Sequence, residues 1–149
     1  MSGWKRRFLV AAMFASALGL VLVATTYPFE VHTDRAWIEE KVEGIDWRLS
    51  PGRPNLDMVQ NLLLMVPLGL ALACAGRARR PWQVALEAAL AALVLSVGVE
   101  GVQILLPERF PQLPDVLRNV CGCVGAGAAG AALRLGPSAA RSREGVRGP

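Results

Sequence analysis

The chain has 149 residues, enough for one domain, and 53% of them are hydrophobic while only 19% are charged. Because the apolar residues are gathered in long blocks, this balance excludes an ordinary soluble domain and indicates a membrane protein. The net charge is +4, but the basic residues lie in short groups without aromatic interleaving, so no nucleic-acid partner is expected.

Four apolar stretches are long enough to cross a membrane as helices. They cover about residues 8–26, 56–75, 82–106 and 116–135, close to the ~20 residues that ~30 Å of hydrocarbon requires. Only helices or closed barrels satisfy the backbone in lipid, and these continuous stretches do not alternate as barrel strands do. The predicted fold is an all-α membrane protein, with one four-helix domain over residues 1–136 and a disordered cytoplasmic tail over 137–149. Pro67 is expected to kink the second helix.

The first apolar stretch follows Lys5, Arg6 and Arg7, an arrangement shared with the start of a signal peptide. Its apolar run is longer than in a typical signal peptide, and no clear cleavage site follows. We therefore expect an uncleaved signal-anchor helix, with a cleaved signal peptide as the alternative.

The loop over residues 27–55 is too long for a simple turn and contains the sequence DRAWIEEKVEGIDWRL. Ile38, Val42 and Ile45 recur there at helical spacing, and Trp37 and Trp47 are of a residue type that favours the membrane surface. The pattern predicts a short amphipathic helix on the outer interface, with an ordinary polar loop as the alternative.

Basic residues mark one side of the predicted membrane domain. They form three groups, which are Lys5, Arg6 and Arg7, then Arg77, Arg79 and Arg80, then Arg134, Arg141, Arg143 and Arg147. If all four segments span, these groups share a side, and the acid-rich 27–55 loop lies opposite with the short turn over 107–114. The positive-inside rule then predicts that both termini are cytoplasmic.

Polar residues from separate parts of the chain converge on the outer third of the bilayer. They are Asp57, Asn61, Glu100, Gln103, Arg109, Asp115, Arg118 and Asn119. Spacings of three or four residues place Asp57 with Asn61, Glu100 with Gln103, and Asp115 with Asn119 on shared helix faces. Helix capping, hydrogen bonding between helices and snorkelling of Arg118 to the headgroups are the simpler explanations for individual members.

Glu100 is the member least compatible with a lipid-facing position. It lies about six residues from the outer end of its helix, or about 9 Å deep. An ionised carboxylate facing lipid costs about 2.5–3.5 kcal/mol at the centre of the membrane and somewhat less toward the surface. We therefore expect Glu100 to face the bundle interior, either protonated or paired with Arg109 or Arg118.

The fourth predicted helix carries small residues every four positions, at Gly122, Ala126 and Gly130. Such a stripe allows the close approach of a neighbouring helix. The stripe extends outward to Asn119, which is therefore predicted to face another helix.

The three cysteines, Cys74, Cys121 and Cys123, all lie within apolar blocks, so they are interpreted as reduced packing residues. Their spacing does not match a zinc site, and no other metal-ligand set or cofactor motif is found in the sequence. Neither a metal nor a cofactor is expected.

The stretches DMVQNLLLMVPLG and VEGVQILLPERFPQLPDVLRNVCG resemble the VanZ-like family of small bacterial membrane proteins over about residues 55–133. The matching positions are Asp57, Asn61, the Pro67–Leu68–Gly69 step, Glu100, Gln103, Arg109, Asp115, Asn119 and Gly122. The sequence departs from the family at Asn61, where many members have histidine, and at Gln112 and Pro114, where acids are frequent. These departures remove groups that a catalytic carboxylate pair would use.

The resemblance implies a four-helix protein of the bacterial cytoplasmic membrane, in a family whose founding member is associated with resistance to teicoplanin, a lipoglycopeptide. It suggests that the outer polar residues recognise a lipid-linked cell-wall precursor, a polar lipid head or such an antibiotic. An intramembrane enzyme with Glu100 or Asp115 as general acid/base, and a structural or assembly role, are the alternatives. A transporter would require several copies, and homo-oligomer formation stays open at this point.

Overall fold

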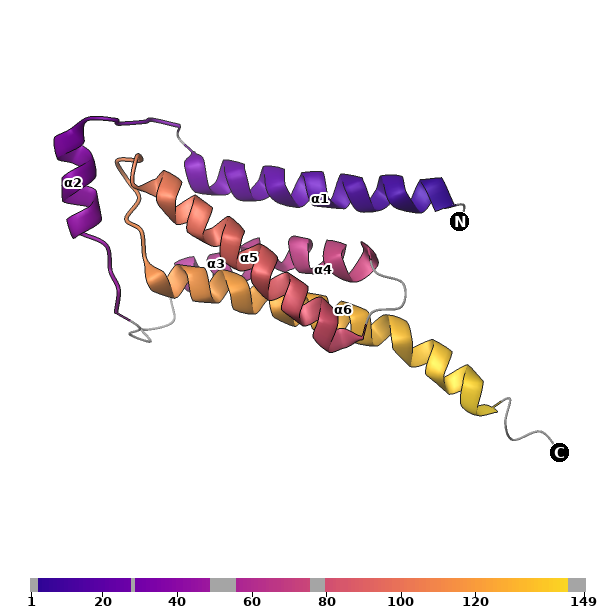
Figure 1. Cartoon of the computed structure of the whole chain (residues 1–149). Coiled ribbons are helices and arrows are strands. Elements are labelled where there is room, and N and C mark those ends of the chain that lie inside the picture. Colours follow the sequence, from indigo (N-terminus) through magenta and orange to yellow (C-terminus); the bar gives the residue numbers. More distant parts are fainter. Residues whose placement is uncertain (1–2, 28, 49–55, 76–79, 145–149) are drawn as a thin grey trace.

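The computed structural model of the chain describes residues 3–27, 29–48, 56–75 and 80–144 (Figure 1), and the side chains of Asp57 and of residues 135–144 lie outside this description. Its helices are α1 (Gly3–Thr26), α2 (Arg35–Glu43), α3 (Leu56–Leu64), α4 (Val66–Ala75), α5 (Pro81–Gln103) and α6 (Leu113–Glu144). Four segments are long and apolar enough to cross a membrane, namely Gly3–Thr26, Met58–Ala75, Pro81–Gln103 and Leu113–Arg134. The prediction of an all-helical protein with four spans is therefore confirmed.

The second span consists of two helices, because α3 ends at Leu64 and α4 begins at Val66. Pro67 is the second residue of α4, where its missing N–H and its ring interrupt the hydrogen-bond ladder of the preceding turn. Helical bonding resumes where the Gly69 amide donates to the Met65 carbonyl at 3.1 Å. The kink expected at Pro67 is thus a full break at Met65.

Helix α6 continues past the fourth span, which ends at Arg134, and extends to Glu144. Residues 137–144, which were expected to belong to a disordered tail, are helical. Ala139, Ala140 and the neighbouring arginines favour helix, so the backbone continues the bonding already established in the span. Residues 145–149 of the expected tail lie outside the described residues.

Helix α6 approaches α3 and α4 closely because glycines remove the side chains between them. A Cβ atom on Gly122 would collide with the Leu62 carbonyl, and one on Gly69 would collide with the Cys123 carbonyl. Farther along α6, a Cβ on Gly130 would lie 2.9 Å from the Ala73 Cβ. The contact has the form of the small-residue interfaces common between membrane helices.

Helix α1 meets the rest of the bundle along one narrow stripe. Its buried residues are Ala17, Val21 and Thr25, spaced four apart on one face. At its start, the Arg6 guanidinium donates to the Cys74 and Ala75 carbonyls at 2.8 and 2.9 Å, which satisfies free groups at the end of α4. Most of the remaining α1 surface is exposed and apolar, as a lipid-facing helix requires.

The end of the bundle where α1 and α5 finish and α3 and α6 begin is covered by α2, and we call it the α2 end (Figure 1). The short helix predicted in the first long loop is present as α2, but it ends at Glu43, before Ile45, and its buried residue is Lys41 while Val42 of the predicted apolar face is exposed. It lies along the segment that joins α5 to α6, with the Trp37 indole donating to the Ile104 carbonyl at 3.1 Å. Asp46 adds backbone bonds with Pro111 and Leu113 at 3.3 and 3.1 Å.

Lys41 holds α2 in place, a role that the sequence did not reveal. Only 4% exposed, it donates to the Pro107 and Arg109 carbonyls at 2.9 and 2.8 Å, and its ammonium lies 3.7 Å from the Phe110 ring centroid. Burial lowers the pKa of Lys41 below its ordinary value of 10.5, and the nearby Glu40 acts in the opposite direction.

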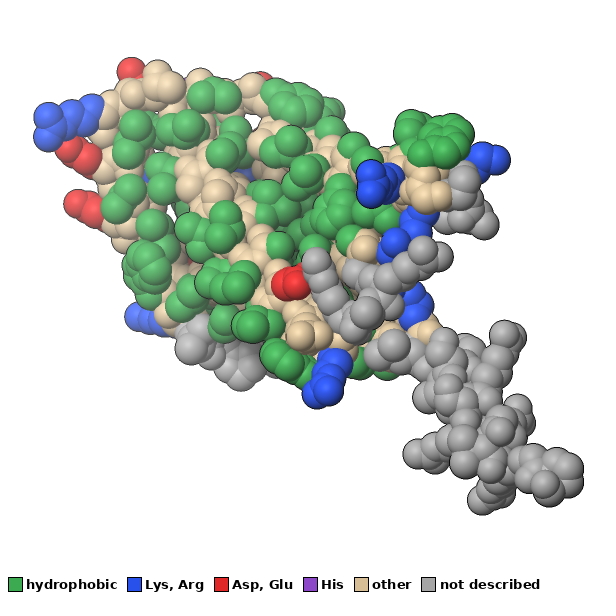
Figure 2. All heavy atoms as spheres, turned by 45° about the vertical axis from the view of Figure 1, so that its right-hand side comes forward, with side chains coloured by type: hydrophobic (Ala, Val, Ile, Leu, Met, Phe, Trp, Pro, Cys, Tyr) green, Lys and Arg blue, Asp and Glu red, His purple; other side chains and the backbone are tan. Residues whose placement is uncertain are grey.

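The opposite end, which we call the basic end, carries Lys5, Arg6, Arg7 and Arg80. Figure 2 shows hydrophobic side chains spread over the middle of the face it presents, with lysine and arginine side chains toward both ends and most acidic side chains toward the α2 end. This distribution is typical of a protein whose middle section is surrounded by lipid.

Candidate functional site: a polar cavity at the α2 end

A cavity of about 690 Å³ lies at the α2 end, where α1, α3, α5, α6 and the α5–α6 segment meet. Each of these five parts contributes polar side chains, which are Thr25, Gln60, Asn61, Gln103, Glu108, Arg109, Gln112, Asp115 and Arg118. The rest of the lining is apolar, from Leu20, Ala24, Leu63, Leu64 and Phe110. The volume lies within the range of small-molecule sites.

Five of the eight residues singled out from the sequence line this cavity, namely Asn61, Gln103, Arg109, Asp115 and Arg118. Glu100 and Asn119 are 9% and 2% exposed and belong to the buried interior of the bundle. The backbone of Asp57 is in the first turn of α3, and its side chain lies outside the described residues.

Glu100 is placed by the antiparallel arrangement of α5 and α6, in which the connecting segment folds back over the end of α5. The Gln112 amide donates to the Glu100 Oε2 atom at 2.8 Å. Of the two alternatives expected for Glu100, an ion pair with Arg109 or Arg118 is not formed among the described residues, where its hydrogen-bond donor is a backbone N–H. The two arginines are bound to other groups.

Arg118 forms an ion pair with Asp115, at 2.6 Å between the Nη1 and Oδ1 atoms. The two residues are one helical turn apart, and each side chain is 20% exposed. A charge-assisted bond of this kind fixes both side chains at the cavity wall. The pair leaves no net charge there.

Arg109 is exposed and reaches across the cavity to α1, where its Nη2 atom donates to the Ala24 carbonyl at 3.3 Å. Within the described part of the chain, no carboxylate forms an ion pair with it. The guanidinium has five N–H donors, so most of them stay available to a ligand.

The cavity is balanced in charge, since Arg109 and Arg118 face Glu108 and Asp115. Its distinguishing feature is a set of four carboxamides, from Gln60, Asn61, Gln103 and Gln112. Carboxamides both donate and accept hydrogen bonds, so they suit hydroxyl and amide groups. Phosphate or carboxylate can bind the free donors of Arg109.

Beneath the cavity, Asn119 lies where α6 packs against its neighbours. Its Oδ1 atom and the Oγ atom of Ser96 are both buried, and neither has a hydrogen-bond partner among the described residues. Ser96 is seven residues from the end of α5 and Asn119 six from the start of α6, so the two lie at about the same depth, roughly 10 Å below the loop.

The helix-packing residues differ in how closely they are approached. Gly122 lies against the α3 backbone and Gly130 against Ala73, whereas Ala126 is half-buried. The sequence did not reveal the contact between Gly69 of α4 and Gly127 of α6. A Cβ atom on Gly127 would lie 3.4 Å from the Gly69 carbonyl oxygen.

Sequence reasoning also missed Gln60, Glu108 and Gln112 as lining residues. Gln60 directly precedes Asn61, and Glu108 and Gln112 belong to the turn that contains Arg109. Their polarity in so apolar a sequence was the available signal. It was not decisive, because a polar residue near a helix end is also explained by solvent or headgroups.

The fold and the cavity define a multi-pass helical membrane protein with a polar site at one end of its bundle. The sequence model of the VanZ/LLP1 family matches residues 7–133, which include the second and third spans, most of the first and fourth, and every residue lining the cavity. The chain therefore belongs to the VanZ/LLP1 family. No match was found to a curated protein or to a solved structure.

Proposed function

We propose that this protein binds the polar head of a membrane-anchored amphiphile at the outer face of the bacterial cytoplasmic membrane. A lipid-linked cell-wall precursor fits the site best, and a polar lipid head or a lipoglycopeptide antibiotic shares the same chemistry. The observation that carries the proposal is the 690 Å³ cavity with its four carboxamides and with Arg109, which forms no ion pair among the described residues, at the rim of the spans.

The lining favours a head that is rich in hydrogen-bonding groups over one that is only charged. Four carboxamides suit the hydroxyl and amide groups of a sugar or peptide, and Arg109 suits a phosphate. The apolar remainder of the wall, including Leu63 and Leu64, suits the part of the ligand nearest its lipid.

The outer location follows from the distribution of basic residues. Lys5, Arg6, Arg7 and Arg80 lie at the basic end, away from the cavity, and the positive-inside rule assigns that end to the cytoplasm. In a variant without native cysteines, Glu108→Cys tests the assignment. An impermeant thiol reagent should label it in intact spheroplasts, and labelling only after lysis would contradict the proposed side.

The catalytic alternative receives no support from the site. Glu100 is absent from the cavity lining, and its Oε2 atom accepts the Gln112 amide, while Asp115 is paired with Arg118. Glu100 is therefore not positioned to exchange a proton with a ligand in the cavity, and Asp115, which lines the cavity, is held there by its ion pair with Arg118. A purely structural role does not explain a polar opening of this size.

Binding can be measured with purified protein in nanodiscs and a fluorescent polyprenyl-diphosphate-linked glycopeptide. Arg109→Gln and Gln103→Leu each remove a donor from the cavity wall, and each should weaken binding about tenfold or more. Arg35→Gln is the matched control, because Arg35 lies on α2, outside the cavity lining, and forms an ion pair with exposed Glu39. It should bind as the parent protein does.

The result that would overturn the proposal is parental affinity in both cavity variants. Equal loss in Arg35→Gln would also contradict it, because the effect would then not come from the cavity. Chromatographic homogeneity of each variant is checked first, so that a folding defect is not read as lost binding.

A further inference from the structure

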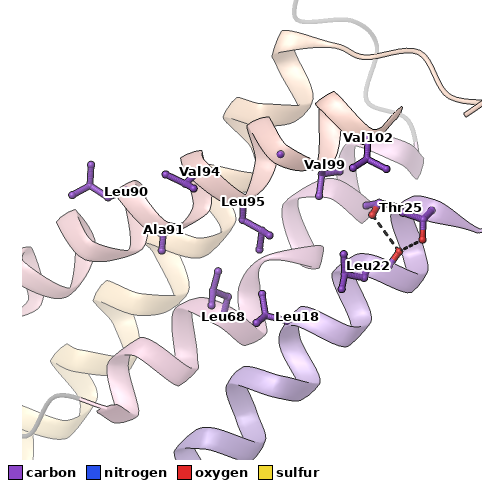
Figure 3. A pocket seen from close by; sticks show the side chains of 12 residues that line it. Leu18, Leu22, Thr25, Leu68, Leu90, Ala91, Val94, Leu95, Val99 and Val102 are labelled. Atoms are coloured by element: carbon purple, nitrogen blue, oxygen red, sulfur yellow. Dashed lines mark hydrogen bonds between the residues drawn. The ribbon is translucent and has the colours of Figure 1, made fainter. Parts of the chain in front are cut away.

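A second cavity, of about 580 Å³, lies as a groove between α1 and α5, with Leu68 of α4 at its base (Figure 3). Its lining is apolar apart from Thr25 and Thr26. Both hydroxyls already donate to main-chain carbonyls of α1, at 2.6 Å from Thr25 to Val21 and 2.6 Å from Thr26 to Leu22. The groove therefore suits a hydrocarbon and offers nothing to a polar ligand.

The groove has the length of one membrane leaflet. Its α5 wall extends from Leu90 to Val102, which is about 18 Å at 1.5 Å per residue. Half of the hydrocarbon core is about 15 Å thick. Val102 directly precedes Gln103 of the polar cavity, so the groove extends from the level of that cavity to about the middle of the membrane.

The groove and the polar cavity meet at Thr25, which lines both. Figure 3 shows Thr25 beside Leu22 near the Val102 end of the groove, with Leu90 toward the other end. Thr25 is buried where α1 packs on the bundle, and its hydroxyl is bound to its own helix, so its side chain is part of the wall that both spaces share.

We propose that the groove holds the hydrocarbon chain of the same amphiphile whose head occupies the polar cavity. The inference rests on the proposed function and narrows its ligand to a molecule anchored in the outer leaflet. A free polar solute would occupy only the polar cavity and would leave the groove empty. The chain would lie between α1 and α5, and the head would turn inward past Thr25.

The narrow docking of α1 explains why the groove stays open. Only the stripe of Ala17, Val21 and Thr25 is buried in α1, so the helix does not close against α5. On the α5 side, a Cβ atom on Gly98 would meet nothing within 4 Å. A side chain at Gly98 would therefore begin in the open space of the groove, which Gly98 lines.

The test uses a photoreactive polyprenyl phosphate with a diazirine in its chain, added to the full-length protein in nanodiscs. Mass spectrometry of the adducts should place them on residues of the groove, such as Leu18, Leu22 and Val94. Gly98→Phe should reduce the adducts and the binding about tenfold, since the phenyl ring would occupy the space proposed for the hydrocarbon chain.

Gly101→Phe is the matched control, because Gly101 is on the same helix with equally open space but does not line the groove. It should leave labelling unchanged. Adducts spread evenly over lipid-facing residues of α6, such as Leu117 and Leu133, would overturn the inference and indicate bulk lipid. Adducts joining two copies of the chain would overturn it in favour of a helix of a second copy.

Failure here is distinguishable from failure of the proposed function. If Arg109→Gln weakens binding while Gly98→Phe does not, binding of the head in the polar cavity is supported and binding of the chain in the groove is contradicted. If Gly98→Phe alone weakens binding, binding of the chain in the groove is supported and Arg109 has no part in head recognition. If neither variant weakens binding, both proposals fall.

Discussion

Helix α6 and helix α1 pack in opposite ways on the same bundle. Glycines bring the α6 backbone against Leu62 of α3 and Gly69 of α4, which leaves no space for another molecule. Helix α1 touches the bundle along a single stripe, and the two cavities lie on either side of its contact. The difference indicates a rigid half that supports the site and an open half that contains it.

The strongest test of the rigid half is Gly122→Leu. The new side chain would collide with the Leu62 backbone, and we expect a loss of about 3 kcal/mol or more in the free energy of unfolding. Gly125→Leu is the control on the same helix, because a Cβ there has open space. Thermal unfolding in detergent measures both, and equal stability of the two variants would contradict the close packing.

The α2 end depends instead on individual polar contacts, of which those of Lys41 are predicted to matter most. Lys41→Met removes the donors to the Pro107 and Arg109 carbonyls, and it should cost about 2–3 kcal/mol. Lys41→Arg keeps the charge and should lose less. Parental unfolding of Lys41→Met would show that α2 is held by other contacts.

The same contact predicts a pH dependence. Since the pKa of Lys41 is lower in the folded protein than its ordinary 10.5, the folded state binds fewer protons than the unfolded state between those two values. Stability should therefore rise with pH in the window just below 10.5, relative to Lys41→Met. Denaturant unfolding of both proteins at a series of alkaline pH values measures the difference, and a fall would contradict it.

A smaller effect is expected at Glu100, where the contact is a single hydrogen bond to the Gln112 amide. Glu100→Ala leaves this amide without its acceptor and should cost about 1–2 kcal/mol. Glu100→Gln keeps an oxygen at the same place and should cost less than half of that. If Glu100→Gln abolished ligand binding with stability intact, the carboxyl would have a role beyond positioning the loop.

The smallest effect is expected at the surface of α2. Arg35 and Glu39 form an ion pair of 2.8 Å, with side chains 92% and 60% exposed. Exposed pairs contribute little because water screens them, so Arg35→Gln should change stability by less than about 0.5 kcal/mol. A larger loss would mean that α2 is held by its outer face as well as by Lys41.

The number of spans, the small helix of the first loop and most of the polar residues at one end were predictable from the sequence. Hydropathy over some twenty residues is a local property, and lipid leaves the backbone almost no alternative to a helix. The spacing of Gly122 and Gly130 likewise followed from helical periodicity, which depends only on position along the chain.

Only the tertiary structure decided how the polar residues are divided. Asp115 forms an ion pair with Arg118, and Glu100 accepts a hydrogen bond from the Gln112 amide. Arg109 faces the cavity and donates to the Ala24 carbonyl. These partners come together because the α5–α6 segment folds over the end of its own hairpin, and α2 then packs on that segment through Lys41. A pairing between distant segments depends on distances of a few ångströms between side chains. The periodicity of the sequence carries no information about these distances.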